Sequence, residues 1–260
     1  LNSFYSLQGR KYDVGLHAIT NFCRPDDRRA PLYKLLRQLD LPYAALDLSP
    51  QKGSRISFPG VDLRFNNQLE TLENEIIKLF PRQIDGFRRL VEAVRQANPF
   101  DLNAPWVSTR ALLPQFIKDP LLIEMILCPL FYYGGAQEGD MDFYQFVILF
   151  RAIFLEGFAR PYEGIRPLLH LLVGQFRQLG GERRMRCGVE RLEAQNGRVQ
   201  SVVLEGGEVV TATHVLSSIG LVETMRLCSD QPAEAFKEDE GQMTFVETIT
   251  VFDRPTAQWG

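Results

Sequence analysis

A glycine and a histidine that follow a strand-like run are the residues of this sequence best suited to chemistry on a bound ring. In the stretch KYDVGLHAITNF, residues 11–22, Gly15 ends the run and His17 lies two residues later between apolar side chains. Glycine lacks a Cβ, so the backbone can approach a planar ligand closely. Imidazole titrates near neutral pH and can donate or accept a proton. The alternative is a histidine with ordinary hydrogen-bond partners at a strand–loop junction, and the stretch alone leaves both open.

Other common catalytic signatures are absent from the sequence. It contains no G-x-S-x-G nucleophile elbow and no H-E-x-x-H zinc motif. Its four cysteines lie far apart, without the spacing of a zinc site or a disulfide scaffold: Cys23, Cys128, Cys187 and Cys228. We therefore assign no catalytic residue and expect no metal site.

Composition indicates an ordinary globular protein. Of 260 residues, 45% are hydrophobic and 23% charged, and the formal net charge of −3 gives no reason to expect a nucleic-acid partner. The low cysteine count and the absence of a signal-peptide pattern favour a cytoplasmic location. The sequence starts without Met and opens almost directly into strand-like residues, so we expect it to be the central part of a longer protein.

The first half of the sequence predicts short strands followed by helices. Strand-like runs are FYSLQ, KYDVG, AALDLS, SRISFPG and VDLRF, the last two joined by a Pro-Gly turn, and APLYKLLRQLDL is a helix. From Gln68 to Leu179 apolar residues recur at helical spacing. Asp119 and Asp140 are predicted helix N-caps, and Gly180 a helix C-terminus. The predicted helices are LETLENEIIKLF, RQIDGFRRLVEAVRQA, DPLLIEMILCPLFYY, DMDFYQFVILFRAIFLEGF and IRPLLHLLVGQFRQLG.

The remainder predicts a β-rich segment, a helix near Leu221 to Leu227 and a last strand. The expected strands are ERRMRCG, VERLEAQ, GRVQSVVLEGG, EVVTAT, HVLSSIG and MTFVETITVFD, with QNG and EGGE as hairpin turns.

Two features of the helical part have competing interpretations. The stretch Met141 to Phe158 is very apolar, but Arg151 and Glu156 interrupt it, which favours a buried helix over a membrane span. The alternative is a wall of an apolar substrate tunnel or a face in shallow contact with a membrane. His170 lies among leucines, and we expect it to be a core histidine.

Taken together, these segments resemble FAD-dependent oxidoreductases of the phytoene desaturase, carotenoid isomerase and retinol saturase type, within the amine oxidase superfamily. In the β-rich segment the matching residues are Gly180, Gly181, Val189, Leu192, Gly197, Val199, Val203, Ala212 and Val215. The opening stretch is similar to the family segment F-D-x-G-x-H-Y-I at Tyr12, Asp13, Gly15, His17 and Ile19. A third segment, Pro161 to Ile165, is similar to P-x-G-G-(I/M), with Glu163 in place of the first glycine.

The resemblance implies an α+β fold in which a mixed-sheet substrate domain with a helical insert is followed by part of an FAD-binding α/β domain. The implied divisions are 1–179 for the substrate domain, 180–230 for a β-meander of the FAD domain and 231–260 for a strand that returns to the substrate domain. The family's N-terminal dinucleotide-binding βαβ unit, with its G-x-G-x-x-G, has no counterpart in the sequence.

The resemblance also implies FAD as the cofactor of the full-length protein, contacted by Gly15, Leu16, His17, Gly164, Val189 and Ser217. Backbone N–H groups at the helix start near Gly164 would suit a polar ring edge, although a carboxylate at Glu163 would repel a reduced, anionic flavin. Val189 would meet the adenine through its backbone, and Ser217 would approach the diphosphate. We expect this chain by itself to carry no FAD.

The implied function is redox chemistry on an apolar, isoprenoid- or polyene-like substrate, by desaturation, saturation or isomerisation. A flavoenzyme of the amine oxidase type is one alternative, and a non-catalytic lipid- or isoprenoid-binding module is another. The implied partners are a small apolar substrate and, through the apolar helices, a peripheral membrane contact.

Overall fold

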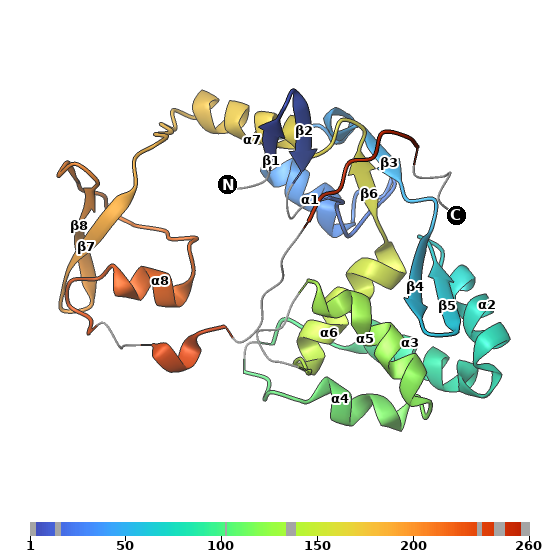
Figure 1. Cartoon of the computed structure of the whole chain (residues 1–260). Helices are drawn as coiled ribbons and strands as arrows, with labels where there is room; N and C mark the ends of the chain where they lie inside the picture. Colours follow the sequence, from blue (N-terminus) through green and yellow to red (C-terminus); the bar gives the residue numbers. More distant parts are fainter. Residues whose placement is uncertain are drawn as a thin grey trace. The chain divides into compact units, whose positions relative to one another are not determined.

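The computed structural model describes residues 4–13, 17–101, 103–133, 139–232, 236–241 and 248–255. The chain divides into two compact units, unit 1 with Leu1–Leu179 and Met243–Gly260, and unit 2 with Gly180–Gln242. The described residues form helices and small antiparallel sheets, an α+β arrangement (Figure 1).

Unit 1 contains seven of the described helices and six of the described strands. The helices are α1 (Pro31–Gln38), α2 (Leu69–Leu79), α3 (Ile84–Gln96), α4 (Thr109–Leu112), α5 (Pro120–Phe131), α6 (Phe143–Phe150) and α7 (Arg166–Gln178). A π-helical turn, Arg151–Glu156, continues α6, and short 3₁₀ turns lie at Tyr43–Leu46, Pro81–Gln83 and Leu113–Gln115. The strands are β1 (Phe4–Leu7), β2 (Arg10–Asp13), β3 (Leu48–Pro50), β4 (Ser54–Phe58), β5 (Val61–Phe65) and β6 (Ala159–Pro161).

Among the described residues these strands form two-stranded antiparallel sheets, β1–β2, β3–β6 and β4–β5, and the parallel pairing of the expected mixed sheet does not occur among them. The β4–β5 hairpin has the predicted Pro-Gly turn, with Phe58 opposite Val61. The predicted strand AALDLS is wrong in its first half, because Tyr43–Leu46 forms a 3₁₀ turn and β3 begins only at Leu48.

The large core of unit 1 lies where the helices pack on the β4–β5 hairpin. Figure 1 shows α2, α3, α5 and α6 gathered beside this hairpin. Fully buried side chains from five elements meet there: Leu63, Ile76, Phe87, Ile126 and Phe150. In the predicted apolar stretch Met141 to Phe158, eight of the 18 residues are buried and only Ile148 is exposed, so it packs into the core of the unit as expected. A smaller cluster under α1 contains Cys23, Leu32, Leu36, Leu41 and Leu46.

The buried helix starts later than the sequence predicts. Its N-cap is Asp142, whose carboxylate accepts a hydrogen bond from the Tyr144 N–H, and not Asp140. Asp140 accepts instead from the Ser108 hydroxyl at 2.6 Å and from the Arg110 N–H at 3.0 Å. Burial opposes ionisation of Asp140, but these hydrogen bonds outweigh it and hold its pKa below the ordinary value. Asp119 is the N-cap of α5 as predicted.

Arg151 and Glu156, which interrupt the apolar stretch, both have polar partners. The Arg151 guanidinium donates to the carbonyl oxygens of Arg95 at 3.0 Å and Ala97 at 2.7 Å, and so caps the C-terminus of α3. Glu156 Oε2 accepts from Asn21 Nδ2 at 2.7 Å. The two charges are therefore tolerated because each lies at an end of the π-helical turn, next to polar groups. Of the part of the chain that the structure describes, no helix has the length and apolarity that crossing a membrane requires.

One asparagine joins the helical part of unit 1 to β6. Asn67 follows β5, and its side-chain amide donates to the Phe158 carbonyl and accepts from the Phe158 N–H, both at 2.9 Å. The Gln51 side chain donates to the same Asn67 oxygen at 2.7 Å. Gly157 has φ +88°, and a Cβ there would lie 2.0 Å from Asn67 Oδ1. Asn67 thus pairs with both backbone groups of Phe158, whose carbonyl also accepts the Gln51 N–H at 3.0 Å, and only a glycine at position 157 leaves the Asn67 side chain the room.

Unit 2 contains a three-stranded antiparallel sheet and one described helix. The elements are β7 (Val189–Gln195), β8 (Arg198–Leu204), β9 (Val209–Val210), α8 (Leu221–Arg226) and a 3₁₀ turn at Lys237–Asp239. The β7–β8 turn is Asn196–Gly197, both with positive φ, as the QNG signal predicts. Residue 192 also forms an isolated parallel bridge with Cys228.

Three predicted strands do not form in the described residues. Residues 182–188 are irregular, and Arg184 there pairs with Glu182 and Glu208 across 3.0 and 2.7 Å. Residues 214–220 are also irregular, and Leu216 is 99% exposed. Residues 248–253 form no strand, and 242–247 lie outside the described residues. A strand needs a ladder of backbone hydrogen bonds to a neighbour, and in residues 182–188 the Glu205 N–H to Gly188 carbonyl bond of 2.9 Å lies only at the last residue.

We predict that Gly157→Ala destabilises unit 1 by about 2–4 kcal/mol, because it adds strain at positive φ and displaces the Asn67 amide from Phe158. Gly60→Ala is the matched control in the same unit, since Gly60 has φ +78° but open space around its missing Cβ. It should cost about 1 kcal/mol. Urea unfolding of the two variants and the wild type measures the difference, and equal costs would show that the Asn67 contact contributes nothing.

Candidate functional site

The candidate site is built around the carboxylate of Asp13, the last residue of β2. Its side chain is only 8% exposed. Asp13 Oδ2 lies 2.8 Å from Arg160 Nη2 on β6 and 3.4 Å from the backbone N of Ile165, at the start of α7. A buried carboxylate requires such partners, because an unpaired buried charge is strongly unfavourable. Asp13 therefore joins β2 to β6 and to the start of α7, two neighbouring elements about 150 positions later in the sequence.

The two sequence segments that resemble the flavoenzyme family meet at this carboxylate. Asp13 belongs to the first segment, and Gly164 and Ile165 belong to the third. Beyond His17 the chain runs beside β6, since Ile19 and Ala159 exchange two backbone hydrogen bonds of 2.7 and 3.0 Å. His17 is four residues from Asp13, a span of at most about 14 Å for an extended chain. Asp13 thus contacts the start of α7, and Ile19, beyond His17, pairs with β6.

The backbone N–H groups at the start of α7 have partners within the chain. The Gly164 N–H donates to the Pro161 carbonyl at 2.9 Å, and the Ile165 N–H faces Asp13. Gly164 has φ +81°, and a Cβ there would lie 2.4 Å from Asp13 Oδ2. Gly164 therefore gives Asp13 the space to reach the helix start, and its contact with a cofactor stays a prediction.

Polar and aromatic side chains around this junction are open to solvent. His17 and Glu163 are exposed, and Tyr162 is 78% exposed. The Arg160 side chain is half-exposed, so its guanidinium also reaches the surface. An exposed imidazole, phenol or guanidinium can stack on or hydrogen-bond to a flat ligand with polar edges. Gly15 and Leu16 lie outside the described residues, and their predicted contacts with the cofactor are untested.

His170 is not the core histidine that we predicted. It is exposed on α7, in a groove of about 560 Å³ whose lining also includes Asp40, Glu163 and Gln175. The prediction failed because α7 is covered on one side only, by the cluster under α1, and none of its residues is fully buried.

The remaining predicted site residues lie in unit 2. Val189 begins β7, where it is opposite Leu204 and 42% exposed. Ser217 is exposed, and its hydroxyl lies 2.6 Å from the Thr224 hydroxyl on α8. Their contacts with the adenine and the diphosphate stay predictions.

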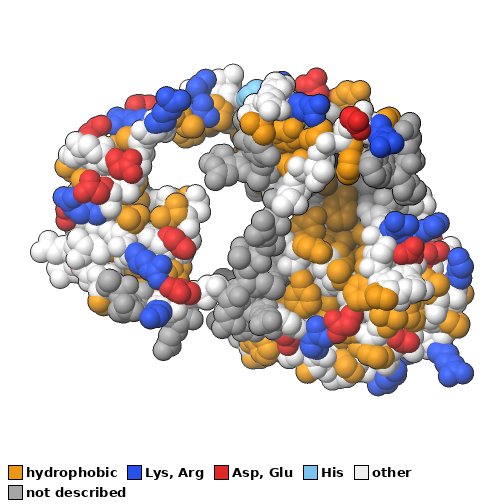
Figure 2. Space-filling view, viewed as in Figure 1, with side chains coloured by type: hydrophobic (Ala, Val, Ile, Leu, Met, Phe, Trp, Pro, Cys, Tyr) orange, Lys and Arg blue, Asp and Glu red, His pale blue; other side chains and the backbone are white. Residues whose placement is uncertain are grey.

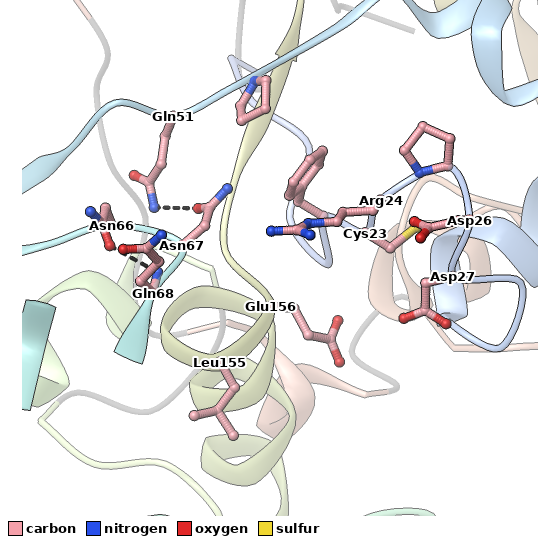
Figure 3. A pocket seen from close by; sticks show the side chains of 13 residues that line it. Cys23, Arg24, Asp26, Asp27, Gln51, Asn66, Asn67, Gln68, Leu155 and Glu156 are labelled. Carbon is pink, nitrogen blue, oxygen red and sulfur yellow. Dashed lines mark hydrogen bonds between the residues drawn. The ribbon is translucent and has the colours of Figure 1, made fainter. Parts of the chain in front are cut away.

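A polar groove of about 820 Å³ includes Asn67 in its lining (Figure 3). One wall carries Gln51 and Asn67, joined by their hydrogen bond, and Glu156 projects from the π-helical turn toward the loop of Asp26 and Asp27. Three carboxylates make this groove a poor site for an apolar chain.

Cys23 lines the same groove but is not equipped to be a nucleophile. The side chain is buried, and burial raises the pKa of its thiol above the ordinary value. Its carbonyl accepts a hydrogen bond from the Tyr43 hydroxyl at 2.5 Å, which anchors the loop to the 3₁₀ turn. The groove therefore shows no activated group.

An apolar surface lies at the end of α5, where Tyr133 follows the helix. Figure 2 shows hydrophobic side chains gathered in a hollow on the viewed face of unit 1. The ring of Tyr133, which is 49% exposed, lies 6.3 Å from that of Phe158, and Phe158 lies 6.4 Å from Phe65. Phe65 contacts Phe154 at 5.0 Å, so aromatic rings continue from the surface into the core. Burial raises the pKa of the Tyr133 hydroxyl, in agreement with an apolar setting.

Sequence reasoning missed two residues that organise the site. Arg160 pairs with Asp13 across 147 positions, and Asn67 pairs with Phe158 across 91. Single arginines and asparagines have no local pattern that reveals such partners. The sequence around Asp13, RKYD, gives no sign of its partner, because Arg10 and Lys11 on the same strand are nearer cations.

We predict that Arg160→Gln destabilises unit 1 by about 1–2 kcal/mol at neutral pH, because Asp13 keeps a buried charge without its cation. The double variant Asp13→Asn with Arg160→Gln should recover part of that loss, which a double-mutant cycle in urea detects. Arg55→Gln is the control, since Arg55 pairs with Asp62 at 3.6 Å with both side chains well exposed. It should change stability by less than about 0.5 kcal/mol. No coupling between Asp13 and Arg160 would contradict the role of the pair.

Comparison with known proteins places this geometry in context. No protein-family model matches the chain. It is 25% identical over 246 residues to a lycopene-forming phytoene desaturase of Paracoccus sp., covering 84% of this chain and 47% of that protein. It is 28% identical over 191 residues to a lycopene-forming phytoene desaturase of Pseudescherichia vulneris, covering 64% of this chain and 38% of that protein. The chain thus spans about half the length, or less, of these relatives.

A solved structure agrees with this relationship at the level of fold. An oxidoreductase from Methanosarcina mazei superposes with a TM-score of 0.59 at 15% identity, over 91% of this chain and 54% of that one. The resemblance predicted from the sequence segments is confirmed: this chain is similar to part of the oxidoreductases of the phytoene desaturase type.

Proposed function

We propose that this chain supplies the substrate side, and part of the cofactor side, of an FAD-dependent oxidoreductase that acts on an apolar, isoprenoid- or polyene-like substrate. The observation that carries the proposal is the Asp13 junction. It brings together the two family-like segments of unit 1, residues 12–19 and 161–165. The names of the relatives support redox chemistry on an apolar polyene.

The residues at the junction suit an isoalloxazine ring. Arg160 offers a cation for the electron-rich edge of a reduced ring, His17 a hydrogen-bond donor, and Tyr162 an exposed aromatic face. The Glu163 carboxylate would repel a reduced, anionic ring, but its side chain is exposed and lines the groove with His170. The donor set at this surface therefore fits the ring.

The redox chemistry in such an enzyme belongs to the flavin. The tasks left to this chain are to orient the ring, to hold an apolar substrate beside it and to exclude water. Arg160 and His17 would hold the ring edge. The aromatic run from Tyr133 to Phe158 would offer the apolar contact for substrate.

We predict that the product of the complete gene purifies with bound FAD and shows flavin absorbance, whereas the 260-residue chain purifies colourless. The physical reason is that the sequence has no G-x-G-x-x-G turn to hold the diphosphate. Visible spectra of both preparations test this, followed by anaerobic incubation with polyenes, which should bleach the flavin if the substrate class is right.

Two results would contradict the proposal. A complete gene product that binds polyenes but no flavin would be a lipid-binding module. A flavin that is bleached by amines and not by polyenes would identify an amine oxidase type of enzyme.

A further inference from the structure

The buried Asp13 carboxylate, at the end of β2, contacts both β6 and the start of α7. Its Oδ2 is shared between the Arg160 guanidinium at 2.8 Å and the Ile165 N–H at 3.4 Å. A charged acceptor strengthens both hydrogen bonds, and the N-terminus of α7 favours a negative charge. Asp13 therefore occupies the position at the helix start that an external anion would otherwise take.

Gly164 leaves the space that the Asp13 carboxylate occupies. A Cβ on Gly164 would lie 2.4 Å from Asp13 Oδ2 and 3.1 Å from Oδ1. Gly164 also has a positive φ of +81°, which an L side chain rarely adopts. A glycine at this position thus lets the end of β2 lie directly on the first turn of α7.

A second, weaker contact joins the same hairpin to the same helix. Arg166 Nη2 lies 3.3 Å from Ser6 Oγ on β1, opposite Lys11 in the β1–β2 pairing. The two strands are fixed to each other by their backbone hydrogen bonds, so both contacts restrain one rigid hairpin. His17 follows Asp13, the last residue of this hairpin, by four residues. The contacts of Asp13 therefore set the point from which the chain continues to His17.

We propose that Asp13 is a positioning residue of the flavin site. It joins the end of β2, four residues before His17, to the start of α7, and Arg160 neutralises its charge, so that no uncompensated carboxylate lies beside a ring that becomes anionic on reduction. Asp13 acts through His17, Arg160 and Gly164 and does not itself touch the reacting atoms. The inference rests on the proposed function, because it assigns Asp13 a task in holding that cofactor.

The test compares Asp13→Asn with Asp62→Asn in the complete gene product. Asn keeps the size and an acceptor oxygen but removes the charge. Asp62 is the matched control, since it also pairs with an arginine, but on the exposed face of β5 at 3.6 Å. We expect Asp13→Asn to raise the Kd for FAD about tenfold, the scale on which outer-shell partners act in other cofactor sites. The flavin spectrum and reduction potential should shift as well, and Asp62→Asn should change none of these.

Hydrogen exchange at the Ile165 amide distinguishes a local loss of the Asp13 contact from a general loss of stability in Asp13→Asn. In Asp13→Asn this amide should exchange faster, while amides in the β4–β5 hairpin keep their wild-type rates. Asp13→Glu is a second variant. It keeps the negative charge but adds a methylene group, for which the close contact with Gly164 leaves no room. We expect it to leave FAD binding impaired.

The outcomes are distinct. If wild-type protein binds FAD and Asp13→Asn matches it in affinity, spectrum and potential, the positioning role is wrong while the proposed function stands. If Asp13→Glu restores full binding, charge and not position is the cause, and the inference is again wrong. If the wild-type product binds no flavin, the proposed function fails and this inference falls with it.

Discussion

The arrangement of the candidate site depends on one buried carboxylate and its need for partners. Asp13 is almost inaccessible to water, so its charge must be met by a cation or by N–H donors inside the protein. Arg160 and the start of α7 meet it, and both are about 150 positions further along the chain. This requirement, together with the apolar cluster in which Ile19 and Leu168 pack, joins β2 to β6 and α7, which follow the helical part in the sequence.

The helical part is attached to this junction by a second polar contact. Asn67 pairs with both backbone groups of Phe158, directly after the glycine that ends the π-helical turn. π-helical turns are rare and often lie near functional sites. Here the turn places Phe158 where its ring meets Tyr133 and Phe65, so the Asn67 contact also sets the position of the apolar surface. The two polar junctions thus place a surface suited to a flat, polar-edged ligand and an apolar surface in the same unit.

Local signals predicted much of this fold. The periodic apolar residues of α2 and α3, the Pro-Gly turn of β4–β5 and the Asn-Gly turn of β7–β8 all act within a few residues, and all are confirmed. Predictions that depend on distant neighbours failed. The start of α6 moved because Asp140 is engaged by Ser108 and Arg110, and residues 214–220 form no strand but lead into α8, where the Ser217 hydroxyl meets that of Thr224. His170 was misplaced because helical periodicity does not say how many sides of a helix are covered.

The family-like segments were recognisable from sequence, but the contact that unites two of them was not. Asp13 and Gly164 were both matched to the family, and no spacing rule connects residues so far apart. The most direct test of the central claim is an experimental structure of the complete gene product with FAD. We predict that the isoalloxazine ring contacts His17 and lies against the Asp13–Arg160–Gly164 junction. An isoalloxazine ring bound elsewhere, with His17 and Arg160 facing only solvent, would contradict the account.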